Sequence, residues 1–352
     1  MKKLLITGSS GLIGSEAVAY FDTKGYKVIG IDNNMRMDFF GPKGDTTWNR
    51  DRLLEKTKNF ESFDIDIRDR KRIFDFFKEH RPDVIIHCAA QPSHDLSKIR
   101  PLDDFDVNAV GTINLLESSR HYTTESPFIF MSTNKVYGDA PNELPIREEE
   151  LRYDYARPED YEGIDETCRI DRCLHSLFGA SKVAGDIVTQ EYGRNYDMPT
   201  VCFRCGCITG PNQSGVEQHG FLNYLVKNAV EGGIYSIFGY KGKQVRDQMH
   251  SIDMVGAFES FIDKPRCGEV YNIGGGRQSN ASLLECLRAI ESKIGRKPKT
   301  EYVEMNRAGD HICYISNTAK FRNHYPEWSL TRSFDDIIDE MLKFESQIIR
   351  NV

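Results

Sequence analysis

The sequence contains no long hydrophobic run. Its longest apolar stretches, such as Val84–Ile86 and Cys88–Ala90, have only the length of a strand, whereas a membrane-spanning helix needs about 20 consecutive apolar residues. The apolar start of the chain ends at Thr7-Gly8, too early for the hydrophobic region of a signal peptide. We therefore expect no membrane partner and a cytoplasmic location.

The sequence also lacks any block of lysines and arginines. It has 46 Lys and Arg residues against 53 Asp and Glu residues, a formal charge of −7. Proteins that bind nucleic acids usually show a basic patch, so we expect no nucleic-acid partner. A small anionic substrate stays open, because such a ligand needs only a few local arginines.

The nine cysteines are an odd number in a chain of 352 residues. This number does not indicate a small disulfide framework, and it favours reduced thiols in a reducing compartment. Cys202, Cys205 and Cys207 are close in sequence, but no second ligand cluster follows at zinc-finger spacing. We therefore predict no metal site.

Short apolar strands alternate with helical patterns through the first half of the chain. Strands are predicted at Lys3–Thr7, Lys27–Asp32, Phe60–Ile65, Asp83–His87, Phe128–Ser132 and Thr200–Cys205. Helices are predicted at Gly11–Thr23, Arg70–Glu79, Val107–Arg120 and Ser176–Tyr196. Such alternation predicts an α/β fold with a Rossmann-like, doubly wound parallel sheet.

A glycine-rich turn joins the first strand to the first helix. Gly8, Gly11 and Gly14 permit a tight turn and let a pyrophosphate approach the helix N-terminus, where free N–H groups attract anions. Asp32 ends the second strand, where a carboxylate can bind the ribose hydroxyls of a dinucleotide. A carboxylate there would repel a 2′-phosphate, so we predict NAD rather than NADP. The positive charge of Arg36 nearby is the one feature that argues against this prediction.

The pattern becomes irregular after Gly206. We predict an NAD-binding domain at residues 1–206 and a smaller α/β substrate-binding lobe, interleaved with it, mainly at residues 207–352. The lobe is expected to contain short helices at Phe221–Val230, Ser282–Ile294 and Phe334–Glu345 and a strand at Val270–Ile273. Residues 33–59 are predicted as a loop with a short helix, and residues 139–175 as a substrate-side loop. Long loops in compact domains usually serve function.

The spacing Gly-x-x-Gly-x-x-Gly resembles that of the extended short-chain dehydrogenase/reductases, in their nucleotide-sugar epimerase and dehydratase branch. Three later segments also resemble this family: Asp66-Ile67-Arg68-Asp69, His87-Cys88-Ala89-Ala90-Gln91 and Asn108-Ala-Val-Gly111-Thr112. Together with the turn, the resemblance implies a cofactor site made of Gly8, Ser10, Gly11, Leu12, Ile13, Gly14, Asp32, Asn33, Asp66, Ile67, Ala89, Ala90, Gln91, Asn108 and Lys182.

The same resemblance implies a catalytic Ser or Thr, a Tyr and a Lys. The Tyr acts as a base while hydride leaves the sugar, the Lys lowers the pKa of the Tyr and holds the nicotinamide ribose, and the hydroxyl binds the reacting oxygen. Thr133 matches the hydroxyl and Lys182 matches the lysine. Positions 178 and 182 share one helix face, but residue 178 is Phe, which has no proton to exchange.

Phe178 at the catalytic tyrosine position has two open explanations. It is either a deliberate Tyr→Phe substitution or a natural residue, with the proton taken by His175, Lys182 or a water. In both cases we predict that the chain binds NAD and substrate but turns over weakly. A catalytically silent NAD-binding protein is the alternative from another functional class.

The resemblance also implies a diphosphate-binding site for a nucleotide sugar. Arg246 lies in a segment similar to the family motif Arg-Asp-x-x-His-x-x-Asp, and Arg307 in one similar to Arg-x-Gly-Asp. Paired arginines suit a diphosphate. A homodimer is expected from the family, through the helices at Val107–Arg120 and Ser176–Tyr196.

Asn134 and Lys135 follow Thr133, where the dehydratases carry Asp-Glu. Because this pair lacks a carboxylic acid, 4,6-elimination is disfavoured, and Asn134 is predicted to contact substrate. The run Ser132–Asp139, with Arg152-Tyr153 and Gly242–Asp247, is most similar to the CDP-paratose 2-epimerase family. That resemblance implies a CDP-linked sugar, epimerisation at C2 through a keto intermediate, and a role in polysaccharide biosynthesis. A 4-epimerase or a dehydrogenase on the same scaffold stays open.

Overall fold

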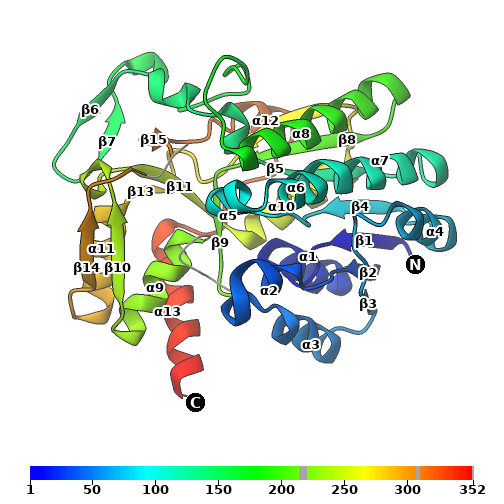
Figure 1. The fold of residues 1–352 in the computed structure, drawn as a ribbon, viewed down its shortest axis with the longest axis horizontal. Coiled ribbons are helices and arrows are strands. Elements are labelled where there is room, and N and C mark those ends of the chain that lie inside the picture. The colour runs from blue at the N-terminus through cyan, green and yellow to red at the C-terminus, as the bar shows by residue number, and fades with distance from the viewer. Residues whose placement is uncertain (214–219, 307–309, 351–352) are drawn as a thin grey trace.

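The computed structural model describes residues 1–213, 220–306 and 310–350. At its centre lies a parallel sheet of seven strands in the order β12-β8-β5-β4-β1-β2-β3 (Figure 1). The strands are β1 (Lys3–Thr7), β2 (Lys27–Ile31), β3 (Phe60–Phe63), β4 (Val84–His87), β5 (Phe128–Thr133), β8 (Thr200–Cys205) and β12 (Glu269–Ile273). The predicted α/β, Rossmann-like fold is confirmed.

Helices cover both faces of this sheet. Because alternate side chains of a strand point to opposite faces, Leu4 and Ile6 of β1 enter one core and Leu5 enters the other. The first core is closed by α1 (Leu12–Thr23), α3 (Thr47–Lys56), α10 (Ser251–Asp263) and α12 (Ala319–His324). The second core is closed by α4 (Arg70–His80), α7 (Gly111–Tyr122) and α8 (Leu177–Tyr196).

The strand predicted within the smaller lobe at Val270–Ile273 belongs to the main sheet instead. β12 pairs in parallel with β8, with Tyr271 beside Phe203. Phe258 of the preceding helix α10 lies in the same core as Leu4. The chain therefore returns to the main sheet after its first excursion into the lobe. The sequence pattern identified the strand but not its partner, because the partner lies far away in the chain.

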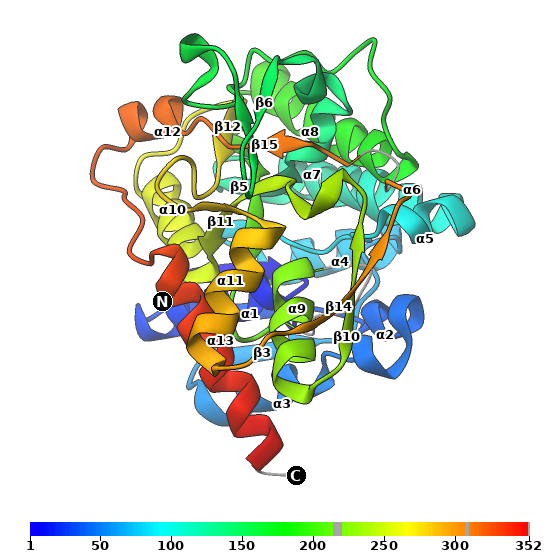
Figure 2. The same ribbon diagram turned by 90° about the vertical axis from the view of Figure 1, so that its left-hand side faces the viewer.

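The smaller lobe has a hydrophobic core of its own. Its strands are β9 (Cys207–Thr209), β10 (Ile234–Phe238), β11 (Val245–His250), β13 (Asn280–Ser282), β14 (Lys299–Val303) and β15 (Cys313–Tyr314). Its helices are α9 (Phe221–Glu231), α11 (Leu283–Ile294) and α13 (Phe334–Arg350), which gather beside β10 and β14 in Figure 2. Leu225, Ile290 and Ile338 bring the three helices together in this core.

The two segments predicted as loops contain more regular structure than expected. Residues 33–59 hold α2 (Met35–Phe40), a 3-10 turn at Gly41–Gly44 and α3. Residues 139–175 hold the hairpin of β6 (Ile146–Glu148) and β7 (Tyr153–Tyr155), with 3-10 turns at Ala140–Glu143 and Pro158–Asp160. Both segments are polar, so their apolar periodicity is weak.

The connection from β4 to α7 is made of short elements. It contains α5 (His94–Ile99), α6 (Pro101–Phe105) and a π-helical turn at Asp106–Val110. The predicted helix Val107–Arg120 therefore begins within this turn and continues as α7. Within the described part of the chain, no helix is both long and apolar enough to span a membrane.

Candidate active site

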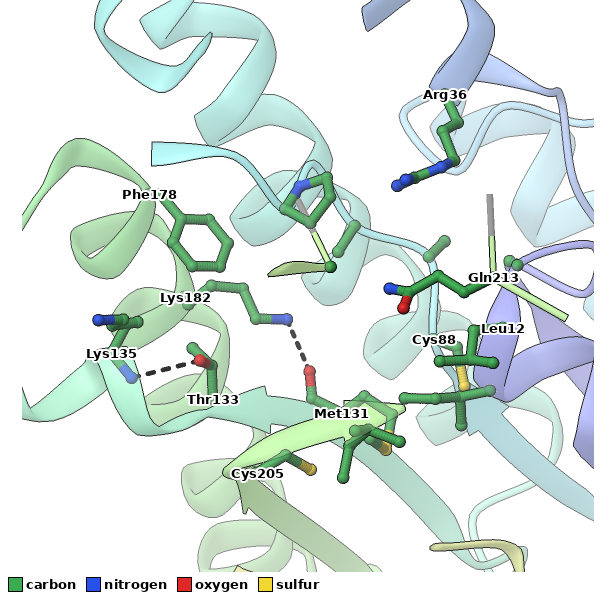
Figure 3. Close-up of a pocket in the computed structure, with 18 of the residues that line it drawn as sticks. Leu12, Arg36, Cys88, Met131, Thr133, Lys135, Phe178, Lys182, Cys205 and Gln213 are labelled. Carbon is green, nitrogen blue, oxygen red and sulfur yellow. Dashed lines mark hydrogen bonds between the residues drawn. The ribbon is translucent and has the colours of Figure 1, made fainter. Parts of the chain in front are cut away.

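A cavity of about 510 Å³ lies where the carboxyl ends of the central strands meet the smaller lobe. Residues that follow β1, β2, β4 and β5 line one side, and residues of β10 and β11 line the other. The strand order reverses between β1 and β4, and ligands of such sheets bind at that point. Figure 3 shows side chains from both halves of the chain directed toward this space.

The glycine turn after β1 leaves no room for side chains. Gly8 has a φ of +68°, and its N–H donates to the carbonyl of Ile31 at 2.8 Å. A Cβ on Gly14 would lie 2.1 Å from the oxygen of Gly8. α1 begins at Leu12, and no side chain caps its first turn. The turn, with Ile13 also in the cavity wall, therefore has the shape and the exposed N–H groups to hold a pyrophosphate.

Asp32 and Asn33 line the cavity immediately after β2. The carboxylate of Asp32 accepts hydrogen bonds from the backbone N–H groups of Ser10 at 2.9 Å and Asn34 at 2.8 Å. The pKa of Asp32 is raised because burial outweighs the hydrogen bonds from these N–H groups, which lower it. Ser10 is not itself in the cavity lining, so its backbone positions the carboxylate.

Asp66 and Ile67 line the same half of the cavity, after β3. The guanidinium of Arg68 lies 2.8 Å from the Asp66 carboxylate. Burial alone would raise the pKa of Asp66, but hydrogen bonds from Arg68 lower it below its usual range. Asp66 is therefore ionised and can accept a hydrogen bond from an adenine amino group.

Ala89 and Ala90 line the cavity after β4, whereas Gln91 and Asn108 lie behind its wall. The N–H of Gln91 donates to Oδ1 of Asn108, and Nδ2 of Asn108 donates to the carbonyl of Gln91, both at 3.0 Å. Nδ2 of Asn108 also reaches Oγ of Ser181 on α8 at 3.0 Å. This pair therefore fixes the β4 segment against the helix that carries Lys182.

Thr133, Phe178 and Lys182 come together in one wall of the cavity (Figure 3). Thr133 ends β5, and the other two share one face of α8. The ammonium of Lys182 donates to the carbonyl of Met131 at 2.7 Å and lies 4.2 Å from the centre of the Phe130 ring. Burial lowers the pKa of Lys182 to about 8.

His175, Tyr137 and Tyr20 do not take the place of the missing phenol. Tyr137 is buried, and its hydroxyl donates to Asn272 at 2.7 Å, outside the cavity lining. Tyr20 has a lysine four residues later, but it lies in α1 and donates to Glu259. His175 is also absent from the lining, and its Nε2 lies 2.8 Å from the carbonyl of Ile170.

Among the described residues of the cavity, Lys135, Arg246 and Asp310 form a cluster of charged groups. Arg246 on β11 lies 2.5 Å from Asp310, and Lys135 lies 3.3 Å from it. Burial would raise the pKa of Asp310, but these two cations hold it well below its usual range. Asn134 also lines this region. Arg307, the second predicted diphosphate ligand, lies outside the described residues.

Asp310 and His94 are among the cavity residues to which the sequence interpretation gave no role. Asp310 closes the late Arg-x-Gly-Asp segment, so the motif itself was the available signal. His94 begins α5, and its ring lies 5.0 Å from the Phe178 ring, edge to face. No sequence signal connects residues 84 positions apart, so only the fold shows this contact.

Comparison with known proteins identifies the family. A model of the NAD dependent epimerase/dehydratase family matches residues 4–274. The chain belongs to this family. CDP-paratose 2-epimerase of Salmonella typhi is 32% identical, covering 98% of this chain and 100% of that protein. dTDP-glucose 4,6-dehydratase of Escherichia coli is 28% identical, covering 91% and 87%.

Solved structures of the epimerase/dehydratase family share this fold. UDP-glucose 4-epimerase of Thermotoga maritima, solved with UDP-glucose, has a TM-score of 0.80 at 25% identity, with 99% of each chain covered. A Tyr→Phe mutant of UDP-glucuronic acid 4-epimerase from Bacillus cereus, solved with NAD and UDP-4-deoxy-4-fluoro-glucuronic acid, has a TM-score of 0.79 at 25% identity, covering 98% and 99%.

The cofactor of this epimerase/dehydratase is NAD. Its nicotinamide supplies reversible hydride transfer. The glycine turn, Asp32 and Asp66 present the donors and acceptors that a pyrophosphate, a ribose and an adenine require. Thr133 and Lys182 line the same cavity as these groups.

Proposed function

We propose that the chain is an NAD-dependent epimerase that acts at C2 of a CDP-linked sugar, similar to CDP-paratose 2-epimerase. NAD bound along the glycine turn would supply the reversible hydride transfer that converts the sugar carbon to a keto group and back. Thr133 binds the reacting oxygen, and Lys182 holds the nicotinamide ribose. The proposal rests on one observation. Thr133, Asn134, Lys135 and Lys182 all line the same cavity.

Epimerisation is favoured over dehydration by the residues after Thr133. Elimination of a hydroxyl needs an acid beside the leaving group. At the positions that follow Thr133, this chain carries an amide at Asn134 and an ammonium at Lys135, and both line the cavity. The full-length similarity to CDP-paratose 2-epimerase favours the C2 position and the CDP nucleotide.

The nucleotide diphosphate is proposed to bind at Arg246 and Arg307. Arg246 and Lys135 both pair with the carboxylate of Asp310. A diphosphate adds at least two negative charges beside these groups, and its oxygens offer a guanidinium a bidentate partner. We expect the diphosphate to replace Asp310 as an ion-pair partner of Arg246 or Lys135.

Phe178 is proposed to slow the reaction without preventing binding. A phenyl ring fills the wall as a phenol would, but it transfers no proton. The Bacillus cereus neighbour was solved as a Tyr→Phe mutant with NAD and a nucleotide sugar, which supports retention of both ligands. A general base contributes about 10²–10⁴-fold to rate, so turnover is expected to be weak.

Product analysis by NMR tests the proposed function. CDP-paratose is incubated with the Phe178→Tyr variant in D₂O. The proposal predicts a mixture of two C2 epimers that retain the original hydrogen at C2, because hydride never exchanges with solvent. Inversion at C4 would identify a 4-epimerase, and a released keto sugar would identify a dehydrogenase. If the variant binds NAD but no nucleotide sugar, the chain is a silent NAD-binding protein.

We also propose a homodimer formed through α7 and α8. Apolar side chains stand exposed on these helices and on the neighbouring α5 and α6, namely Ile99, Leu102, Phe105, Ile113, Ile187 and Tyr196. Ile99 and Leu102 are 74% and 79% exposed. Several exposed apolar side chains on neighbouring helices are typical of a protein interface.

A further inference from the structure

We propose that His94 takes the sugar hydroxyl proton in place of the missing phenol. This inference rests on the proposed function. Phe178 occupies the phenol position, and the imidazole of His94 lies against it, with 5.0 Å between the ring centres. His94 lines the cavity together with Thr133 and Lys182. His94 is the ionisable group in ring contact with Phe178 within the described residues.

The position of His94 is set by elements outside the catalytic motif. It is the first residue of α5, whose N-terminus is capped by Ser93, and Oγ of Ser93 accepts from the N–H of Leu96 at 3.3 Å. Gln91 ties the preceding segment to α6, because its Nε2 donates to Asp104 at 2.9 Å. These bonds fix the backbone on both sides of His94, whose ring contacts Phe178 of α8.

Lys182, Cys88 and His175 are less suited than His94 to accept the proton. Lys182 already donates to the carbonyl of Met131, and an ammonium has no lone pair to offer. Burial raises the pKa of the Cys88 thiol to about 12, so it stays protonated. His175 is outside the lining. An imidazole is the usual proton carrier at neutral pH, because its neutral form has a lone pair that can accept a proton.

The transfer conserves protons and electrons. The sugar O–H bond breaks and its proton forms an N–H bond on neutral His94, while the C–H bond breaks and its electron pair leaves as hydride to NAD⁺. The sugar carbon is oxidised to a ketone, and NAD⁺ is reduced. After the ketone turns, hydride returns to its opposite face and the imidazolium returns the proton to the alkoxide oxygen. No other reactant is consumed.

A double-mutant cycle tests this role. His94→Gln is expected to lower kcat tenfold or more, toward the ~10²–10⁴-fold that a general base contributes, with little change in KM. In the Phe178→Tyr background the same change is expected to have almost no effect, because the phenol then accepts the proton. His175→Gln is the matched control, and we expect it to change kcat by the same factor in both backgrounds. Equal losses from His94→Gln in both backgrounds would overturn the proposal.

A second readout does not depend on turnover. The imidazole ¹⁵N resonances of protein loaded with NAD are recorded before and after addition of a CDP-sugar, and His94 is assigned from the His94→Gln variant. We expect the His94 signals to move on binding, while those of His175 do not. If the CDP-sugar binds by calorimetry but the His94 signals stay fixed, the proposal is wrong. If no nucleotide sugar binds, the proposed function itself fails.

Discussion

At the scale of single residues, the proposed function depends most on Phe178, whose ring carries no hydroxyl group. Phe178 lies in one cavity wall with Thr133 and Lys182, and we propose that it takes the place of the family tyrosine with almost no change in the wall that ligands meet. What differs is a single hydroxyl group. The site therefore separates binding from proton transfer, which are usually tested together.

Phe178→Tyr is predicted to raise kcat at least tenfold. A general base contributes about 10²–10⁴-fold to rate, and the gain in kcat should be smaller than this because His94 already supplies part of it. The affinity for NAD should stay the same, because the ring keeps its position. Steady-state kinetics with a CDP-sugar measure the change. Phe178→Leu is the control that removes the ring and adds no hydroxyl; unchanged turnover in the tyrosine variant contradicts the account.

Lys182 is predicted to make stability depend on pH in the alkaline range. Burial lowers its pKa to about 8, whereas an unfolded lysine titrates near 10.4. Between these values the unfolded chain binds more protons, so the free energy of unfolding rises with pH. Below pH 8 the buried ammonium reduces stability.

Denaturant unfolding of the wild type and Lys182→Met from pH 7 to pH 10, without added NAD, measures this effect. The stability of the wild type relative to the variant should increase over that range by on the order of 1–3 kcal/mol. Other titrating groups cancel in the difference. A difference that does not change with pH would show that Lys182 titrates as an exposed lysine.

At the scale of elements, each strand end delivers one part of the site. The turn after β1, Asp32 after β2, Ala89 after β4 and Thr133 after β5 were all predicted from sequence, because strand and motif lie next to each other in the chain. The contact of His94 with Phe178 was not predicted, because it joins α5 to α8 across 84 residues. Local sequence patterns predict helices and strands, but contacts between distant segments are seen only in the folded structure.

Gly14→Ala is predicted to abolish tight binding of NAD. The added Cβ would lie 2.1 Å from the carbonyl oxygen of Gly8 and would force the turn open. Gly256→Ala is the matched control in α10, where a Cβ would lie 3.7 Å from Trp328. This control should bind NAD normally and gain about 0.5–1 kcal/mol of stability. Calorimetric titration with NAD and thermal melts compare the two, and equal NAD affinities would contradict the account.

Arg246→Met is predicted to weaken nucleotide-sugar binding without affecting NAD. A hydrogen bond to a charged group contributes about 1.5–3 kcal/mol, equivalent to roughly a 10–100-fold loss of affinity for a CDP-sugar. Arg246 lies on β11, across the cavity from the glycine turn, so the NAD site should be intact. Isothermal titration with each ligand measures both values. A similar loss for both ligands would indicate a general collapse of the lobe.

At the scale of the whole molecule, sequence reasoning gave the fold class and most of the main sheet. It missed β12 as the seventh strand, because the pairing of β12 with β8 joins distant segments. It also underestimated the helices in residues 33–59, where charged residues obscure the apolar period. The domain boundary at residue 206 stays a prediction. α10 and β12 lie after this boundary in the chain but pack with the main sheet.

The double change Ile113→Glu with Ile187→Glu is predicted to convert the proposed dimer into monomers. These side chains stand on α7 and α8, and charges buried between two copies would be unpaired. Ile234→Glu is the control, since Ile234 is also exposed but lies on β10 of the smaller lobe. Light scattering after gel filtration gives the mass. A mass equal to two chains in the double variant would place the interface elsewhere.

The central claim is that one cavity holds NAD and a nucleotide sugar together, with the reacting carbon beside Thr133 and Lys182. The most direct measurement is mass spectrometry of the small molecules released from the purified protein, after incubation with NAD and a CDP-sugar and removal of free ligand. The account predicts one NAD and one CDP-sugar per chain. Recovery of no dinucleotide would contradict it.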